Sequence, residues 1–162
     1  MSDLQNDILV LGIGNLLMND EGVGIHAVTR LEKEGIKGAD TMDGGTGGFH
    51  LLAFIQSYKI IIIIDASLDQ FPPGHVRVLQ PRYAKDFPKQ LSAHEIGLKD
   101  LIDSAILLGN MPELHLVAIS VNDFQDMGMD LSPEVEGAIP LAIRHVRAIV
   151  EKNSSSRPNP AQ

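Results

Sequence analysis

Five polar residues stand where predicted strands end or predicted helices begin: Asp20, Glu21, Asp43, Asp65 and His94. In a parallel sheet the carboxyl ends of the strands lie along one edge, and α/β proteins bind their ligands in the crevice at that edge. Carboxylates and one imidazole together form a set of oxygen and nitrogen donors. Such a set suits a divalent transition ion such as nickel, manganese, iron or zinc, without choosing among them. The pattern therefore predicts a metal site at one edge of a sheet.

Each of these residues also has an ordinary structural interpretation. Asp20 and Glu21 would be favourable at the N-terminus of a helix simply because they are negative there, and an aspartate after a strand often caps the following turn. A single histidine is more often a surface or core residue than a ligand, and we interpret the histidines other than His94 in that way. Two features favour a site. Asp65 ends the very apolar run Ile60–Ile64, and His94 lies at a junction that fits a helix-capping sequence.

The elements that would position these residues are predicted from hydrophobic periodicity and capping signals. Their alternation predicts a three-layer α/β/α sandwich with a five-stranded, mostly parallel twisted sheet. The strand at His75–Leu79 follows the short Pro72–Gly74 connection, which cannot hold a crossover helix, so we expect it to run antiparallel to the preceding strand. The predicted strands are Asp7–Leu11, Asp40–Asp43, Ile60–Ile64, His75–Leu79 and Leu114–Val121, and the predicted helices are Asp20–Glu34, Phe49–Ser57, Ile96–Leu108 and a last helix starting at Ser132 and Pro133, with a kink at Pro140.

Length and composition exclude several classes of protein. The 162 residues are expected to form one domain over residues 1–152, followed by a disordered Ser/Pro/Asn-rich tail, Asn153–Gln162. A net charge of −8 without a basic run argues against nucleic-acid binding. The absence of cysteine rules out disulfides, thiolate metal sites and a cysteine nucleophile. The N-terminus lacks a signal-peptide pattern and the longest apolar run is too short to span a membrane, so we expect a cytoplasmic protein that does not enter membranes.

Several well-known motifs are incomplete or missing. The run Gly12-x-Gly14-x-x-Leu17 lacks the third glycine of the dinucleotide-binding fingerprint. The sequence has no Walker lysine motif and no Gly-x-Ser-x-Gly nucleophile elbow. The run His94 to Leu98 begins like a zinc-protease helix but has leucine where the second histidine is needed. The incomplete glycine motif makes a nucleotide-binding module a weak hypothesis, which a dinucleotide-binding assay would test.

Four motifs, in this order and at these separations, resemble those of the hydrogenase maturation endopeptidases. The resemblance covers about residues 7–150 and implies a single α/β/α domain that cuts a C-terminal extension from the large subunit of nickel–iron hydrogenases after nickel insertion. The family's metal-binding Glu, Asp and His fall on Glu21, Asp65 and His94. The motifs are Gly12-Ile13-Gly14-Asn15 with Asp20-Glu21-Gly22-Val23-Gly24, then Asp43-Gly44-Gly45-Thr46, Ile64-Asp65-Ala66 and His94-Glu95-x-Gly97-Leu98.

The resemblance also implies how the residues would work. The carboxylates would recognise nickel that arrives in the substrate, so the protein itself would carry no other cofactor. Asp43, or a water near the site, would act as the base. The family is assigned as aspartic-type, although the sequence shows no pair of Asp-Thr-Gly motifs that would form an aspartic dyad. The partner would be the large-subunit precursor and the protein would act as a monomer. The alternative from another class is a nickel-binding assembly factor that cuts nothing, and its motifs would be the same.

Overall fold

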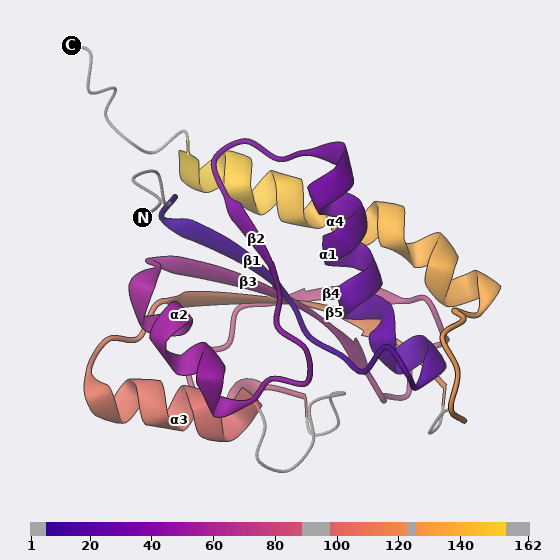
Figure 1. Cartoon of the computed structure of the whole chain (residues 1–162), viewed down its shortest axis with the longest axis horizontal. Helices are drawn as coiled ribbons and strands as arrows, with labels where there is room; N and C mark the ends of the chain where they lie inside the picture. Colours follow the sequence, from indigo (N-terminus) through magenta and orange to yellow (C-terminus); the bar gives the residue numbers. More distant parts are fainter. Residues whose placement is uncertain (1–5, 89–97, 123–125, 155–162) are drawn as a thin grey trace.

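A five-stranded sheet runs through the middle of the molecule (Figure 1), and four of its strands are parallel. The computed structural model describes residues 6–88, 98–122 and 126–154. The strand order is β2-β1-β3-β5-β4, and β4 runs antiparallel to β5. This arrangement confirms the predicted fold class. The strands are β1 (Ile8–Gly12), β2 (Asp40–Asp43), β3 (Ile60–Ser67), β4 (Val76–Leu79) and β5 (Glu113–Ser120).

Helices cover both faces of the sheet. In Figure 1, α1 (Val23–Glu34) and α4 (Pro133–Ser154) lie on one face, and α2 (Leu52–Ser57) and α3 (Leu98–Leu108) lie on the other. The described ranges also contain three short 3₁₀ helices: η1 (Asn19–Gly22), η2 (Phe49–Leu51) and η3 (Ala84–Asp86). None of the helices in the described ranges is long and apolar enough to cross a membrane.

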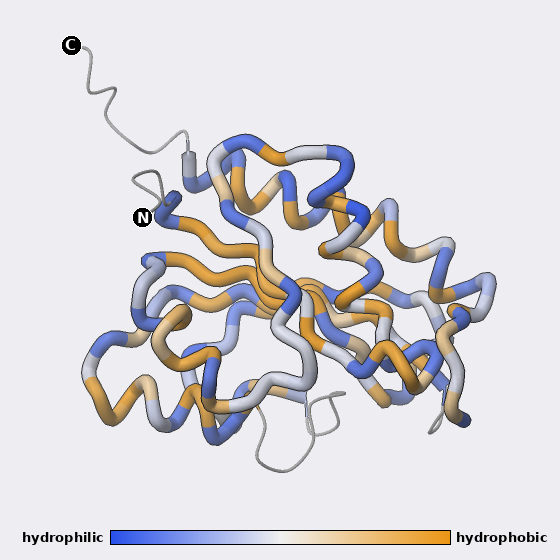
Figure 2. The backbone as a smooth tube through the Cα atoms, in the orientation of Figure 1, coloured by the Kyte–Doolittle hydropathy of each residue, from blue (hydrophilic) through white to orange (hydrophobic). Residues whose placement is uncertain are grey.

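Burial on both faces explains why the central strands are continuous apolar runs rather than alternating ones. Successive side chains of a strand point to opposite faces. On β3, Ile62 and Ile64 therefore pack under α1 and α4, whereas Ile61 and Ile63 pack under α2 and α3. The hydropathy colouring shows the same concentration of apolar residues along the central strands (Figure 2). The core is thus two layers separated by the sheet, aliphatic except for the buried ring of Phe87.

The strand at β4 runs in the predicted direction but beside a different neighbour. We expected it to pair with the preceding strand, β3, because the connection is short. Instead β5 lies between them, and Val76 of β4 pairs with Ile119 of β5. The two strands β3 and β5 are both long and apolar and pair in parallel over Ile60–Ser67. Pairing them in the centre buries more apolar surface than placing the half-exposed β4 there would.

Smaller differences concern the ends of elements. The predicted helix over Asp20–Glu34 is a 3₁₀ turn followed by α1, and Phe49–Ser57 is likewise divided into η2 and α2. The last helix continues through Pro140 and ends at Ser154, two residues into the predicted tail. Residues 155–162 lie outside the described part of the chain. The predicted single domain over residues 1–152 and the predicted disordered tail therefore stay predictions.

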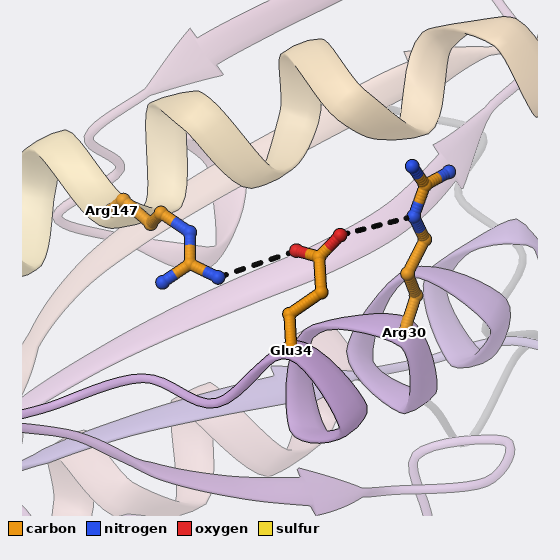
Figure 3. Close-up of polar contacts among 3 residues, drawn as sticks. All are labelled: Arg30, Glu34 and Arg147. Atoms are coloured by element: carbon orange, nitrogen blue, oxygen red, sulfur yellow. Dashed lines mark hydrogen bonds and ion pairs between the residues drawn. The ribbon is translucent and has the colours of Figure 1, made fainter.

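An ion-pair cluster joins α1 to α4 at the surface. The carboxylate of Glu34 lies between two arginines, with Nε of Arg30 at 3.4 Å and a guanidinium nitrogen of Arg147 at 3.3 Å (Figure 3). All three side chains are more than a third exposed, so each pair contributes little to stability. The packing of the two helices therefore depends on their buried aliphatic faces.

One glycine sets how closely α1 approaches the sheet. A Cβ atom on Gly24, in the first turn of α1, would collide with the carbonyl oxygens of Ile13 and Ile64. Both are backbone oxygens, Ile13 directly after β1 and Ile64 within β3, and they have little freedom to move. The missing side chain therefore lets the start of α1 lie directly on β3 and on the residue that follows β1.

A half-buried polar contact lies at the amino end of the parallel strands, at the start of β2. The carboxylate of Asp40 accepts hydrogen bonds from the hydroxyl of Tyr58 at 2.9 Å and from the side-chain amide of Asn6 at 2.7 Å. Burial, and then the hydrogen bond and negative charge of Asp40, raise the pKa of Tyr58 from 10.0 to about 12. Since the folded state holds the phenolic proton more tightly, this contribution to stability is complete below pH 10 and is lost as the pH rises through 12.

The substitution Gly24→Ala should lower the free energy of unfolding by about 1–3 kcal/mol, because overpacking against the backbone outweighs the gain in helix propensity. The matched control is Gly137→Ala in α4, where nothing lies within 4 Å of the new methyl group. That substitution should raise stability by roughly 0.5–1 kcal/mol. Urea unfolding of both variants measures the change in the free energy of unfolding. If both substitutions changed this free energy in the same direction, the packing argument would be contradicted.

The variant Tyr83→Phe leaves Tyr58 as the only tyrosine, because the chain has two. Its tyrosinate absorbance should then rise with a midpoint at about pH 12. Adding Asp40→Asn should move the midpoint part of the way back towards 10, because the charge is removed while the burial remains. Circular dichroism recorded on the same samples separates titration from unfolding by alkali. A midpoint near 10 in the Tyr83→Phe variant alone would contradict the assigned environment.

Candidate functional site

β1 and β3 lie side by side at the topological switch point of the sheet, where successive connections of the chain lead to opposite sides of β1. From β1 the neighbouring strand is β2 on one side and β3 on the other. Ligands of open α/β sheets bind in the crevice at such a point. Asp65 lies near the end of β3, and Glu21 lies in η1, which packs against β3. The structure thus brings two of the predicted ligands to the same end of the sheet.

Backbone contacts hold η1 in this position. The amide of Ile13 donates to the carbonyl of Ile64 at 3.0 Å, which extends the pairing of β1 with β3 beyond Gly12. The amide of Asn15 donates to the carbonyl of Glu21 at 3.2 Å. A Cβ atom on Gly14 would collide with that same carbonyl oxygen. Gly14 therefore allows the chain that carries Glu21 to lie against the turn after β1.

Buried charge in the described residues is confined to three acidic side chains. Asp20, Glu21 and Asp65 are 3%, 2% and 0% exposed, and none of the lysines or arginines in these ranges is buried. One carboxylate oxygen of Asp65 accepts a hydrogen bond from the amide of Ala66 at 2.8 Å. Burying carboxylates is costly unless something compensates their charge. This concentration of acidic groups favours a cation, and carboxylate oxygens are suitable ligands for a divalent one.

The third predicted ligand, His94, lies outside the described residues. Its position relative to Glu21 and Asp65 is therefore a prediction that the structure does not test. Within residues 6–88, 98–122 and 126–154, no three histidine, aspartate or glutamate side chains are grouped closely enough to hold a metal ion. A set of two carboxylates would need a further donor, from this chain or from a bound partner.

Asp43 ends β2 opposite Gly12 of β1, and its side chain is exposed. Its carboxylate accepts a hydrogen bond from the amide of Gly45 at 2.8 Å, which forms a tight turn. The amide of Gly44 donates to the carbonyl of Gly12, and the amide of Gly14 donates to the carbonyl of Gly45, both at 2.8 Å. The start of the glycine-rich loop is therefore fastened to the turn after β1, at the same edge of the sheet as Glu21.

Asp20 has a different role from its neighbour Glu21. Its two carboxylate oxygens accept hydrogen bonds from the amide and the hydroxyl of Ser132, at 2.7 and 2.8 Å. The carbonyl of Ser132 accepts from the amide of Glu136, as an N-cap residue does at the start of α4. Asp20 therefore does lie at the start of a helix, as the ordinary interpretation of an acidic residue suggests. The helix whose N-cap residue it binds is α4, however, and not α1, which follows Asp20 in the sequence.

Sequence reasoning missed this link and the contact of Gly24 with the strand ends. Ser132 was predicted as the N-cap of the last helix and Asp20 as part of an acidic pair, each from its own neighbourhood. They lie 112 positions apart. A single sequence contains no signal that joins them.

Comparisons with known proteins agree with the geometry. The family described as HycI, hydrogenase maturation protease, matches residues 25–149, which include Asp43, Asp65 and His94. The hydrogenase expression/formation protein HupD of Rhizobium leguminosarum bv. viciae is 36% identical over 141 residues, covering 84% of this chain and 70% of that protein. The hydrogenase 2 maturation protease of Escherichia coli K12 is 32% identical over 151 residues, covering 90% and 92%.

A solved structure is similar over almost the whole chain. The hydrogenase maturating endopeptidase HybD from E. coli superposes with a TM-score of 0.81 at 30% sequence identity, and the match covers 93% of this chain and 94% of that one. Similarity in sequence and in fold therefore extends beyond the short motifs around the site. The chain belongs to the hydrogenase maturation protease family.

Proposed function

We propose that this protein is an endopeptidase that removes the C-terminal extension of a nickel–iron hydrogenase large-subunit precursor after nickel has been inserted. The observation that carries the proposal is the burial of Glu21 and Asp65 at the end of β1 and β3, in a chain of the hydrogenase maturation protease family. Their carboxylate oxygens are chemically suited to bind a divalent ion, and the carboxyl end of a parallel sheet is where such folds bind their ligands. Recognition of a metal ion in the substrate is the role that fits both features.

Nickel acts in this proposal as part of the substrate. The ion is held by thiolates of the precursor, and Glu21, Asp65 and His94 complete its coordination from the side of the protease. Carboxylate and imidazole groups are chemically suited to that task. The contact fixes the precursor relative to the protease, and correct placement of two reacting groups can lower a barrier by several kcal/mol. A precursor without nickel lacks the contact and is not placed.

The scissile segment then lies along the loop that starts at Asp43. In our proposal Asp43 acts as the base: it takes a proton from a water molecule as the water oxygen attacks the scissile carbonyl carbon. The same proton is passed to the leaving nitrogen as the C–N bond breaks. Two observations support this role. The Asp43 carboxylate is exposed, and one of its oxygens is held in place by the amide of Gly45.

The proposal includes two expectations about the working state of the protein, namely that it acts as a monomer and that it acts in the cytoplasm. Sedimentation of the purified protein and cell fractionation test them. The rival function is a nickel-binding assembly factor without protease activity, and incubation with the precursor separates the two.

The purified protein should cut a nickel-loaded precursor and leave the nickel-free precursor intact, as seen by a shift of the large-subunit band on a gel. Glu21→Ala and Asp65→Ala should raise KM for the loaded precursor about a hundredfold, or ~2.7 kcal/mol of recognition. His94→Gln should have a smaller effect, because the amide still offers a lone pair.

The control for these variants is Glu32→Ala, which removes an exposed carboxylate from the outer face of α1. It should process the precursor like the wild type. Equal processing of loaded and nickel-free precursor by the wild type would overturn nickel recognition. Binding without any processing would favour the assembly factor.

Asp43→Asn should lower kcat by about 10²-fold or more, the usual contribution of a general base, while KM changes little. The amide oxygen of asparagine can still accept the Gly45 hydrogen bond, so the turn is kept and the chemistry alone is removed. Single-turnover cleavage of nickel-loaded precursor measures the rate. A variant with full kcat would show that Asp43 only shapes the loop.

A further inference from the structure

The segment that leads to Glu21 is bonded to a distant part of the chain, residues 126–132. The backbone amide of Asn19 donates to the carbonyl of Gly128 at 2.7 Å, and the amide of Gly128 donates to the carbonyl of Leu17 at 2.8 Å. The Asn19 side chain donates to the carbonyl of Asp126 at 2.9 Å and accepts from the amide of Asp130 at 3.1 Å. One asparagine thus makes three hydrogen bonds to this segment, and its side chain uses both its donor and its acceptor.

The backbone of Asn19 supports the same arrangement. Its φ of 48° lies in the left-handed region, and Asn19 is the only residue other than glycine in the described ranges with a positive φ. Asparagine tolerates that region better than most residues. A Cβ atom on Gly128 would collide with the Asn19 side chain, so a larger residue there would displace that side chain from its present position. The turn at Asn19 starts η1 and directs the next two residues into the molecule, where both are buried.

Asp20 adds a second attachment point one residue closer to Glu21. Its carboxylate accepts the amide and the hydroxyl of Ser132 at 2.7 and 2.8 Å, and it is 3% exposed. Hydrogen bonds to an ionised carboxylate are among the stronger ones in proteins, and two of them on one residue also fix its orientation. The carbonyl of Glu21 itself accepts a hydrogen bond from the amide of Asn15, in the turn after β1. The backbone of Glu21 is therefore held from both directions.

We propose that Asn19 and Asp20 are positioning residues, which hold Glu21 in the place where it meets the nickel of the precursor. The proposal rests on the proposed function for what Glu21 contacts, but the positioning itself is a property of the free protein. Residues 126–132 and the start of α4 form the frame to which η1 is fastened. Loosening that frame moves Glu21 without changing any group that touches the substrate.

The test compares Asp20→Ala with Asp20→Asn and Ser132→Ala. Asp20→Ala should raise KM for the nickel-loaded precursor at least tenfold and change kcat less than twofold. Asp20→Asn should restore KM to within about threefold of the wild type, because its amide accepts from the Ser132 amide and donates to the Ser132 hydroxyl. Ser132→Ala should have a smaller effect than Asp20→Ala, because the backbone amide of residue 132 still donates to Asp20, and the double variant should be no worse than Asp20→Ala alone.

The matched control is Asp40→Ala. It removes a carboxylate that accepts hydrogen bonds from two side chains, those of Tyr58 and Asn6, at the amino end of the parallel strands, away from Glu21. It should lower thermal stability and leave KM unchanged. A purely structural role of Asp20 would make the two variants behave alike, and that result would overturn the proposal.

Amide hydrogen exchange gives a readout that needs no substrate. In Asp20→Ala, the amides of Asn15 and Glu21 should exchange at least tenfold faster than in the wild type, because the bonds that hold η1 are weakened. The amide of Gly35, which donates to Leu31 at the far end of α1, should not change. Unchanged exchange at Glu21 would overturn the positioning role. If the Asp20→Ala amides exchanged faster but the wild-type protein did not cut nickel-loaded precursor, the proposed function would be refuted. The positioning role of Asp20 would still hold.

Discussion

Burial of acidic side chains at one end of an otherwise aliphatic molecule is the constraint on which the rest of the structure depends. Asp20, Glu21 and Asp65 lie in a fold whose core consists of two largely aliphatic layers without tryptophan or cysteine. Burying a carboxylate is unfavourable unless hydrogen bonds or a cation compensate its charge. Glycines let η1 and α1 approach the strand ends, and Ser132 supplies two donors to Asp20.

Much of the fold could be predicted because its signals are local. The run Ile60–Ile64 is β-branched throughout and too short for a buried helix, so it is predicted as a strand. The strand β2 was predicted with the bounds that the structure shows, Asp40–Asp43. The neighbour of β4 could not be predicted, because strand order depends on which pairing buries more surface. The site was predicted in part. Glu21 and Asp65 lie at the expected edge, but the separate role of Asp20 depends on a contact with Ser132 that no local pattern reveals.

The glycine-rich loop after β2 shows why composition alone misleads. Its glycines suggest a flexible connection, yet its first residues are bonded to the turn after β1 through Gly44 and Gly45. Gly45 and Gly47 have positive φ values of 57° and 82°, so glycine is needed there for the path of the chain. The loop is therefore better described as a third side of the site than as a hinge. Its backbone and the Asp43 carboxylate are in place before any substrate arrives.

The order of strands in the sheet also affects how the chain can fold during synthesis. β4 leaves the ribosome before β5, yet β5 is the strand with which it pairs. Until then β3 presents an open apolar edge, because β5 must still be inserted between β3 and β4. Ser132 follows later still, so the segment that carries Glu21 gains its last attachment only when α4 begins to emerge. A chain that ends before residue 132 therefore contains all five strands but lacks the partner of Asp20, so the segment that carries Glu21 is not yet fully attached.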